Sequence, residues 1–119
     1  MTLYSRGDVV LISFVFTDET GAKQRPAVII SSDAYHRQHR ETIISAITSK
    51  IDRILAGDHL VSHWQDAGLL FPSVATGIIR TIKQSMITRK LGTLSRDDLR
   101  EIDRQLAIAL GLNSGTGRR

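Results

Sequence analysis

The chain of 119 residues contains no cysteine, and this absence excludes disulfide bonds and thiolate metal sites. A protein without cysteine suits a reducing compartment, so we expect it in the cytoplasm. No stretch approaches the roughly 20 consecutive apolar residues that span a bilayer. The segment 1–8 also lacks the apolar run of a secretory signal. We therefore expect a soluble protein with no membrane partner.

Aromatic residues are few, at 5% of the chain. That share leaves little for the broad base-stacking surface of a general single-strand-binding protein. The formal net charge of +4 permits a nucleic acid partner, but many proteins this basic bind nothing acidic. A nucleic acid would have to be recognised mainly through polar side chains.

Short apolar runs rich in β-branched residues predict strands over 9–16, 27–30 and 42–47. The polar stretch 17–25 has no periodicity and is closed by Pro26, which predicts an exposed loop. The polar segment between the second and third strands could carry a short helix. The first half of the chain therefore indicates β structure.

The second half begins with a weaker pattern between residues 49 and 72, where an edge strand over 58–61 and a turn over 67–69 are predicted. Two further strands are predicted over 73–82 and 85–91, with Gly92 ending the second.

The last element is a helix. Ser95 and Asp98 have the spacing of a capping box, and Gly111 ends the apolar pattern. Its apolar residues recur at helical spacing: Leu99, Ile102, Leu106 and Leu110. Many short strands and one terminal helix predict a mostly β (α+β) fold, a small SH3-like antiparallel β-barrel with a C-terminal amphipathic helix. We expect one domain over 1–112 and a flexible tail over 113–119.

Short motifs follow one another along this framework. Gly-Asp at 7–8 opens the first strand, and Arg-Pro-Ala-Val stands at 25–28. Thr-Ser at 48–49 follows the third strand, and Leu-Gly-Thr-Leu at 91–94 precedes the helix. Each motif is common by itself, but the ordered set resembles the MazF/PemK toxins of type II toxin–antitoxin systems over about residues 6–110.

The resemblance implies an endoribonuclease that cuts single-stranded RNA, including mRNA, and so inhibits translation and growth. The ribose 2′-hydroxyl would attack the neighbouring phosphate, with no metal and no cofactor. The resemblance also implies a homodimer and a cognate antitoxin, whose flexible acidic segment would fold over the RNA groove.

The resemblance assigns catalysis to Arg25 and Thr48. A guanidinium offers forked donors that match phosphate oxygens, so the role of Arg25 is clearest as a phosphate-binding group, because arginine holds its proton too firmly for a simple acid. The Thr48 hydroxyl could donate to the same phosphate. Without the resemblance, Arg25 is a solvated loop residue before a proline, and Thr48 ends a strand before a turn.

RNA binding is expected of further polar residues near these two: Ser49, Lys50, Lys23, Gln24 and Arg80. Isolated lysines and arginines are more often only solvated surface. The general base is unassigned, because an acid that several relatives carry three positions before Arg80 is replaced by Gly77. Asp18 or Glu19 in the predicted loop could accept the proton, although loop acids commonly serve only as turn formers.

The histidines offer an alternative, since a pair of them could cleave RNA by acid–base catalysis near neutral pH. His36 and His39 lie in the segment after the second strand, whereas His59 and His63 lie four residues apart. A metal site at the second pair is not expected, because no third ligand stands at a supporting spacing.

Two other functions are compatible with the same fold. One is a non-enzymatic poison like the CcdB toxins that trap DNA gyrase; these depend on an aromatic residue near the end of the last helix, and here no aromatic follows Phe71. The other is a catalytically inactive homologue that still binds nucleic acid or antitoxin, which the glycine at position 77 would favour.

Overall fold

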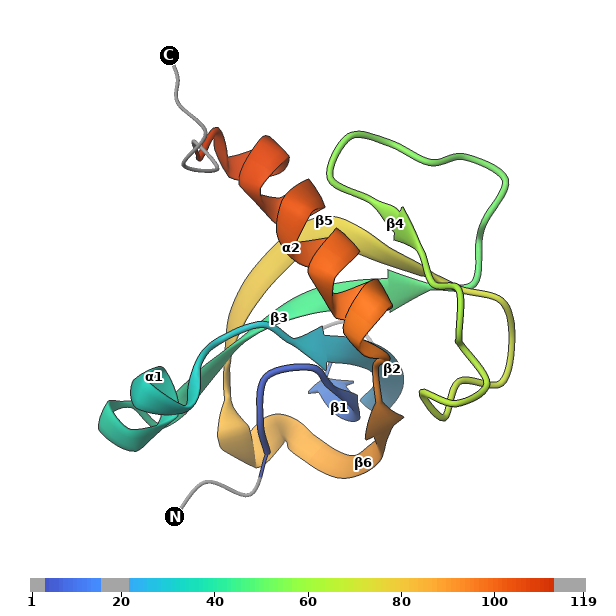
Figure 1. The fold of residues 1–119 in the computed structure, drawn as a ribbon. Coiled ribbons are helices and arrows are strands. Elements are labelled where there is room, and N and C mark those ends of the chain that lie inside the picture. The colour runs from blue at the N-terminus through green and yellow to red at the C-terminus, as the bar shows by residue number, and fades with distance from the viewer. Residues whose placement is uncertain (1–3, 16–21, 113–119) are drawn as a thin grey trace.

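The computed structural model describes residues 4–15 and 22–112. Its strands, in chain order, are β1 (Asp8–Val15), β2 (Ala22–Ile29), β3 (Glu41–Thr48), β4 (His59–Leu60), β5 (Val74–Lys83) and β6 (Ile87–Thr93). The helices are α1 (Asp33–Gln38), the short 3-10 helix η1 (Gln84–Met86) and α2 (Arg96–Leu110). Figure 1 shows α2 lying across the sheet, with α1 beyond one end of β3.

The strands form one antiparallel sheet in the order β4-β5-β3-β2-β1-β6. The predicted α+β class with a C-terminal helix is confirmed. The sheet curls as a barrel does, but it is open, because no pairing between β4 and β6 joins its edges within the described residues. The predicted antiparallel strand pattern is therefore confirmed, whereas the sheet is barrel-like without being closed.

Apolar residues are buried on both faces of the sheet. In β2, Val28 belongs to the apolar cluster beneath α2, whereas Ala27 and Ile29 belong to a second cluster. Neighbouring residues of a strand point to opposite faces, so this alternation divides the core into two parts. From α2, Ile102 and Leu106 are buried in the first cluster. Helix α2 therefore covers one face of the sheet.

Helix α2 has the caps that the sequence predicts. The Ser95 hydroxyl accepts from the Asp98 amide at 3.1 Å, and Gly111 adopts a left-handed conformation with φ 70° at the C-terminal end. Leu110, the last apolar residue of the predicted stripe, is exposed, because it lies a full turn beyond Leu106, the last helix residue in the core.

Most element predictions are confirmed: the strands over 9–15, 27–29, 42–47, 59–60 and 74–82, the short helix α1 and the turn at 67–68. The predicted loop is wrong over 22–25, because these residues extend β2 and pair with β1, as Gln24 does with Ser13. The predicted end at Gly92 is also early, since β6 continues to Thr93, which faces Asp8 of β1.

Some predictions fall on residues 16–21 and 113–119, which lie outside the described residues. These include Asp18 and Glu19 as proton acceptors and the flexible tail. Within the described residues, no helix combines the length and apolarity needed to cross a membrane.

Candidate functional site

The site begins where β2 separates from β3. Ile30 donates its amide to Ile43 at 3.0 Å, and the ladder pairs Ala27 with Ala46 as its last register position. In an antiparallel ladder every second residue of a strand donates its amide to the same neighbour. After Ile30 and Val28, the next donor from β2 to β3 would therefore be the amide of residue 26. That residue is Pro26, which has no N–H to donate. The ladder therefore ends at the position where β2 lacks a donor.

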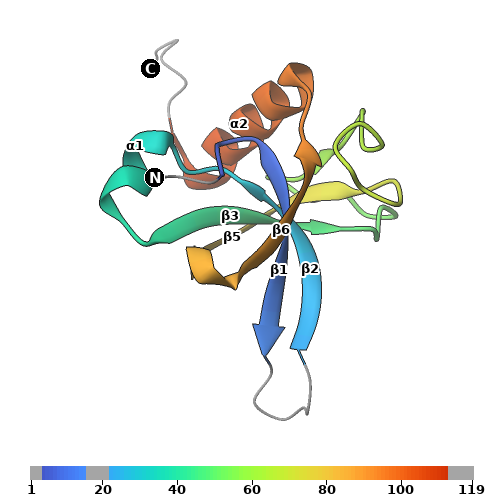
Figure 2. The same cartoon turned by 90° about the horizontal axis from the view of Figure 1, so that it is seen from below.

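Beyond Pro26 the two strands follow different partners. Strand β2 continues with β1 as a hairpin that projects from the body of the molecule in Figure 2, and β3 continues beside β5 to Thr48. If the register were extended, Arg25 would stand opposite Thr48, at a position where no main-chain bond forms and side chains lie close.

A groove of about 1000 Å³ occupies the place where the strands part. Its floor is apolar and includes Leu11, Ala27 and Ile44. Its polar lining comes from several elements: Arg25, Thr48, Ser49, Lys50, Ser73, Arg80 and Arg89. The fold thus collects, around one hollow, residues that stand far apart in the sequence.

Five of the predicted site residues meet in this groove: Arg25, Thr48, Ser49, Lys50 and Arg80. The other two that the structure describes, Lys23 and Gln24, are exposed on β2 farther along the hairpin and do not line it. The structure therefore separates the predicted RNA-binding set into a groove group and a hairpin group.

The Thr48 hydroxyl is partly ordered by its own turn. Its oxygen accepts the Lys50 amide at 3.1 Å, and that contact leaves the hydroxyl proton available to another acceptor. Thr48 is half-buried, whereas Arg25 is exposed. The site can therefore offer a fixed hydroxyl donor on one side and a guanidinium on the other.

Positive charge dominates the groove. Arg25, Lys50, Arg80 and Arg89 line it, and no carboxylate of the described residues does. All four cations are exposed to solvent. Such a surface attracts phosphates and repels cationic ligands.

Among the lining residues that sequence reasoning missed are Arg89 and Phe71. Arg89 stands on β6, where it faces Leu11 of β1 across the ladder, so only the strand pairing brings it near Arg25. Phe71 lies in the loop before β5 and is 62% exposed. A single aromatic residue before Pro72, at the end of a segment with a weak secondary-structure pattern, does not by itself indicate a binding role.

A second hollow of about 680 Å³ adjoins the groove and shares Thr48 and Lys50 with it. Asp58 lines it and accepts the Gly77 amide at 2.9 Å through one carboxylate oxygen and the Leu55 amide at 2.9 Å through the other. A carboxylate therefore lies at the backbone of Gly77, the position where the resemblance led us to expect an acid.

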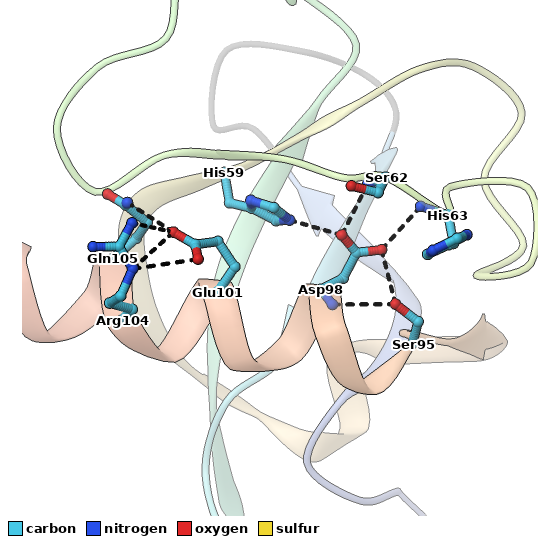
Figure 3. A network of polar contacts seen from close by, with 8 residues as sticks. All are labelled: His59, Ser62, His63, Ser95, Asp98, Glu101, Arg104 and Gln105. Carbon is cyan, nitrogen blue, oxygen red and sulfur yellow. Dashed lines mark hydrogen bonds and ion pairs between the residues drawn. The ribbon is translucent and has the colours of Figure 1, made fainter.

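A separate polar network joins the start of α2 to β4 and to the segment after it (Figure 3). The buried Asp98 carboxylate lies 2.7 Å from Nε2 of His59 and accepts the amides of Ser62 at 2.8 Å and His63 at 2.9 Å. Ser95 donates to it at 3.1 Å. Burial acts to raise the pKa of the Asp98 carboxyl, but hydrogen bonds from His59 and the other donors outweigh it and hold that pKa below its usual value of 3.8.

All four histidines lie within the described residues, and none lines the groove. His36 is buried with Nε2 2.5 Å from the Ser31 hydroxyl, His39 stacks on Tyr35 with ring centroids 4.2 Å apart, and His59 is bound to Asp98. The histidine alternative for catalysis therefore finds no support in the geometry. Within the described residues no group of three metal-binding side chains is gathered.

Comparison with known proteins finds a family that matches nearly the whole chain. A family model described as PemK-like, MazF-like toxin of type II toxin-antitoxin system matches residues 5–110.

Solved structures share the fold. A mycobacterial endoribonuclease in complex with its cognate antitoxin is 22% identical, with a TM-score of 0.73 over 92% of this chain and 97% of that one. The toxin MazF-mt6 of Mycobacterium tuberculosis is 23% identical, with a TM-score of 0.71 over 89% and 98%. MazF in a MazE–MazF complex from Deinococcus radiodurans is 20% identical, with a TM-score of 0.78 over 95% and 100%.

Proposed function

Because the chain belongs to the PemK-like, MazF-like toxins of type II toxin-antitoxin systems, we propose that it is an endoribonuclease that cuts single-stranded RNA, including mRNA, without a metal ion. The observation that carries the proposal is the groove in which Arg25 and Thr48 stand on the two strands that part at Pro26. Similar structures include proteins described as endoribonucleases. Cutting mRNA would inhibit translation and growth.

The reaction needs only the substrate's own nucleophile. The ribose 2′-oxygen forms a bond to the neighbouring phosphorus, the bond from phosphorus to the 5′-oxygen breaks, and a 2′,3′-cyclic phosphate results. One proton leaves the 2′-hydroxyl and one is delivered to the departing 5′-oxygen. DNA lacks the hydroxyl, so the reaction selects RNA.

Arg25 stabilises the phosphate as negative charge builds on its equatorial oxygens. Its fork of N–H donors fits two of those oxygens at once, and its exposure in the groove lets a strand reach it. It acts by binding charge, since a guanidinium does not readily release its proton.

Thr48 donates its hydroxyl to a phosphate oxygen and holds the scissile group in line with the 2′-oxygen. The Lys50 amide, which donates to the Thr48 oxygen, helps to hold that side chain in place before substrate binds. Ser49, Lys50 and Arg80 bind the neighbouring phosphates from the same groove. Lys23 and Gln24 extend the RNA surface along the β1–β2 hairpin.

The proton acceptor is a carboxylate in the β1–β2 connection, either Asp18 or Glu19. In sequence both lie between β1 and the β2 strand that carries Arg25. A carboxylate can take the 2′-proton directly or through one water.

The same groove is the proposed target of an acidic antitoxin segment. Four cations and an apolar floor are suited to bind an acidic chain with interspersed apolar side chains. Among the similar structures are a toxin bound to its cognate antitoxin and MazE–MazF complexes. We further propose a homodimer that works in the cytoplasm.

The decisive experiment incubates the purified chain with a long single-stranded RNA in EDTA and maps the fragment ends. Discrete cuts with 2′,3′-cyclic phosphate or 3′-phosphate ends and 5′-hydroxyl ends are expected from wild type, and Arg25→Ala should lose them. Arg100→Ala is the matched control, since Arg100 is an exposed arginine on α2 outside the groove.

Other outcomes separate the alternatives. Intact RNA together with growth arrest on expression would point to a gyrase-type poison. Intact RNA with no arrest, but with antitoxin binding, would point to an inactive homologue. Full cleavage by a folded Arg25→Ala variant would reject the site assignment.

A further inference from the structure

We propose that Phe71 stacks on an unpaired base of the RNA strand and so provides much of the binding energy that phosphate contacts do not. This inference rests on the proposed function. Phe71 lines the groove with 62% of its surface exposed, and within the described part of the chain it is the one aromatic side chain that does so. Trp64, by contrast, packs against the buried core.

The loop that carries Phe71 is rigidly supported. On one side of it, Leu69 is buried and donates its amide to Trp64 at 3.1 Å. On the other, the buried Ser73 hydroxyl donates to the carbonyl of Phe71 at 2.8 Å. An exposed apolar ring on a loop fixed at both ends loses little conformational entropy on binding a ligand.

The base of this loop is packed directly on β6. A Cβ at Gly68 would lie 2.1 Å from the Leu91 carbonyl oxygen, and a Cβ at Gly92 would lie 2.5 Å from the carbonyl carbon of Ala67. Gly68 also has φ +84°, which a glycine adopts without strain. Such close backbone packing holds the start of the loop against β6, the strand that also carries Arg89.

Charge and aromatic surface occupy the groove together. Arg25, Lys50 and Arg89 attract phosphates, while Phe71 offers a ring face that phosphates cannot use. In a single strand the bases are unpaired and turn away from the phosphates, so a strand bound through its phosphates presents bases to the remaining surface. Every base has a π-face, so the contact contributes affinity more than sequence choice.

The test measures binding of a 2′-O-methyl RNA, which cannot be cut, by fluorescence anisotropy. Phe71→Ala should raise Kd roughly 10- to 100-fold, which is the range for losing one stacked base. Phe71→Leu, which keeps an apolar side chain without a π-face, should behave like Phe71→Ala, whereas Phe71→Trp should bind like wild type. Ile108→Ala, at an exposed apolar position on α2 outside the groove, should change nothing.

A second measurement finds the base. Scanning 2-aminopurine through the RNA should locate one position whose fluorescence is quenched by wild type and by Phe71→Trp but not by Phe71→Leu. Equal Kd values for Phe71→Leu and Phe71→Trp, or an unchanged Kd for Phe71→Ala, would overturn the inference. So would a Phe71→Ala variant that binds RNA normally and loses only its antitoxin.

Failure of the inference and failure of the proposed function give different results. If wild type cuts RNA in EDTA while Phe71→Ala binds the analogue as wild type does, only the stacking role is rejected. If wild type neither cuts RNA nor binds the analogue, both are rejected.

Discussion

Ala27 of β2 and Ala46 of β3 form the last pair of the β2–β3 ladder, and two residues farther along stand Arg25 on β2 and Thr48 on β3. The strands part between these positions at Pro26, which has no amide to donate to β3. We infer that this missing donor helps to open the groove, which is lined by both side chains to which we assign the reaction.

Replacing the proline tests this origin of the groove. Pro26→Ala supplies the missing amide, so we expect the β2–β3 ladder to extend to Ile47 and the groove to narrow. Hydrogen exchange should show a protected amide at position 26, and RNA cleavage should fall. An unprotected amide together with unchanged cleavage would mean that another feature separates the strands.

The hydroxyl of Thr48 can be removed at nearly constant volume. Thr48→Val should lower kcat about 100-fold, the usual loss for one transition-state donor, with little change in KM. Thr48→Ser keeps the hydroxyl and should retain most of the activity. A Thr48→Val enzyme with a normal kcat would show that the hydroxyl takes no part in the reaction.

The charged lining predicts how RNA binding depends on salt. Each phosphate contact on a single strand contributes about 0.7 to the slope of log K against log salt. Arg89→Ala should therefore reduce that slope by about 0.7, whereas Arg100→Ala should leave it unchanged. An unchanged slope for Arg89→Ala in a salt titration would remove Arg89 from the phosphate contacts.

Acid should destabilise the protein partly through Asp98. Its pKa in the folded state is below the usual 3.8, so the stabilisation is complete above pH 3.8 and is lost as the pH falls through the lower folded value. In chemical denaturation between about pH 5 and 2, the free energy of unfolding should fall less steeply with decreasing pH for Asp98→Asn than for wild type. Asp97→Asn, at a neighbouring exposed carboxylate, should keep the wild-type slope, and an equal flattening there would refute the assignment.

Gly68 and Gly111 both have a positive φ, but only Gly68 has atoms close to the place of a Cβ. Alanine substitutions at the two positions therefore distinguish backbone strain from a steric clash. Gly68→Ala brings a Cβ against the Leu91 carbonyl and should lower the free energy of unfolding by about 3 kcal/mol or more. Gly111→Ala, where nothing lies within 4 Å, should cost about 1 kcal/mol. Similar losses for both in denaturant titrations would show that the loop moves away from β6 at little cost.

Much of the fold could be predicted from local pattern. The strands within 9–15 and 42–47 can be predicted because they are rich in the β-branched residues that fill the two apolar clusters. Helix α2 can be predicted because Ser95 and Gly111 cap a stripe of apolar residues. These features depend on neighbours in the chain, which a sequence displays directly. The loop over 22–25 was misjudged because its polar residues are ordered by pairing with β1, a partner that local pattern does not reveal.

The sequence by itself placed Arg25, Thr48 and Ser49 in one ordered set of motifs, and it contained the proline at which the β2–β3 ladder ends. Only the tertiary structure decided which residues share a groove. It brought Arg89 and Phe71 to the same hollow, placed Lys23 and Gln24 outside it, and set the Asp58 carboxylate at Gly77. The physical reason is that strand order and register, which arise from contacts between distant segments, fix which side chains meet.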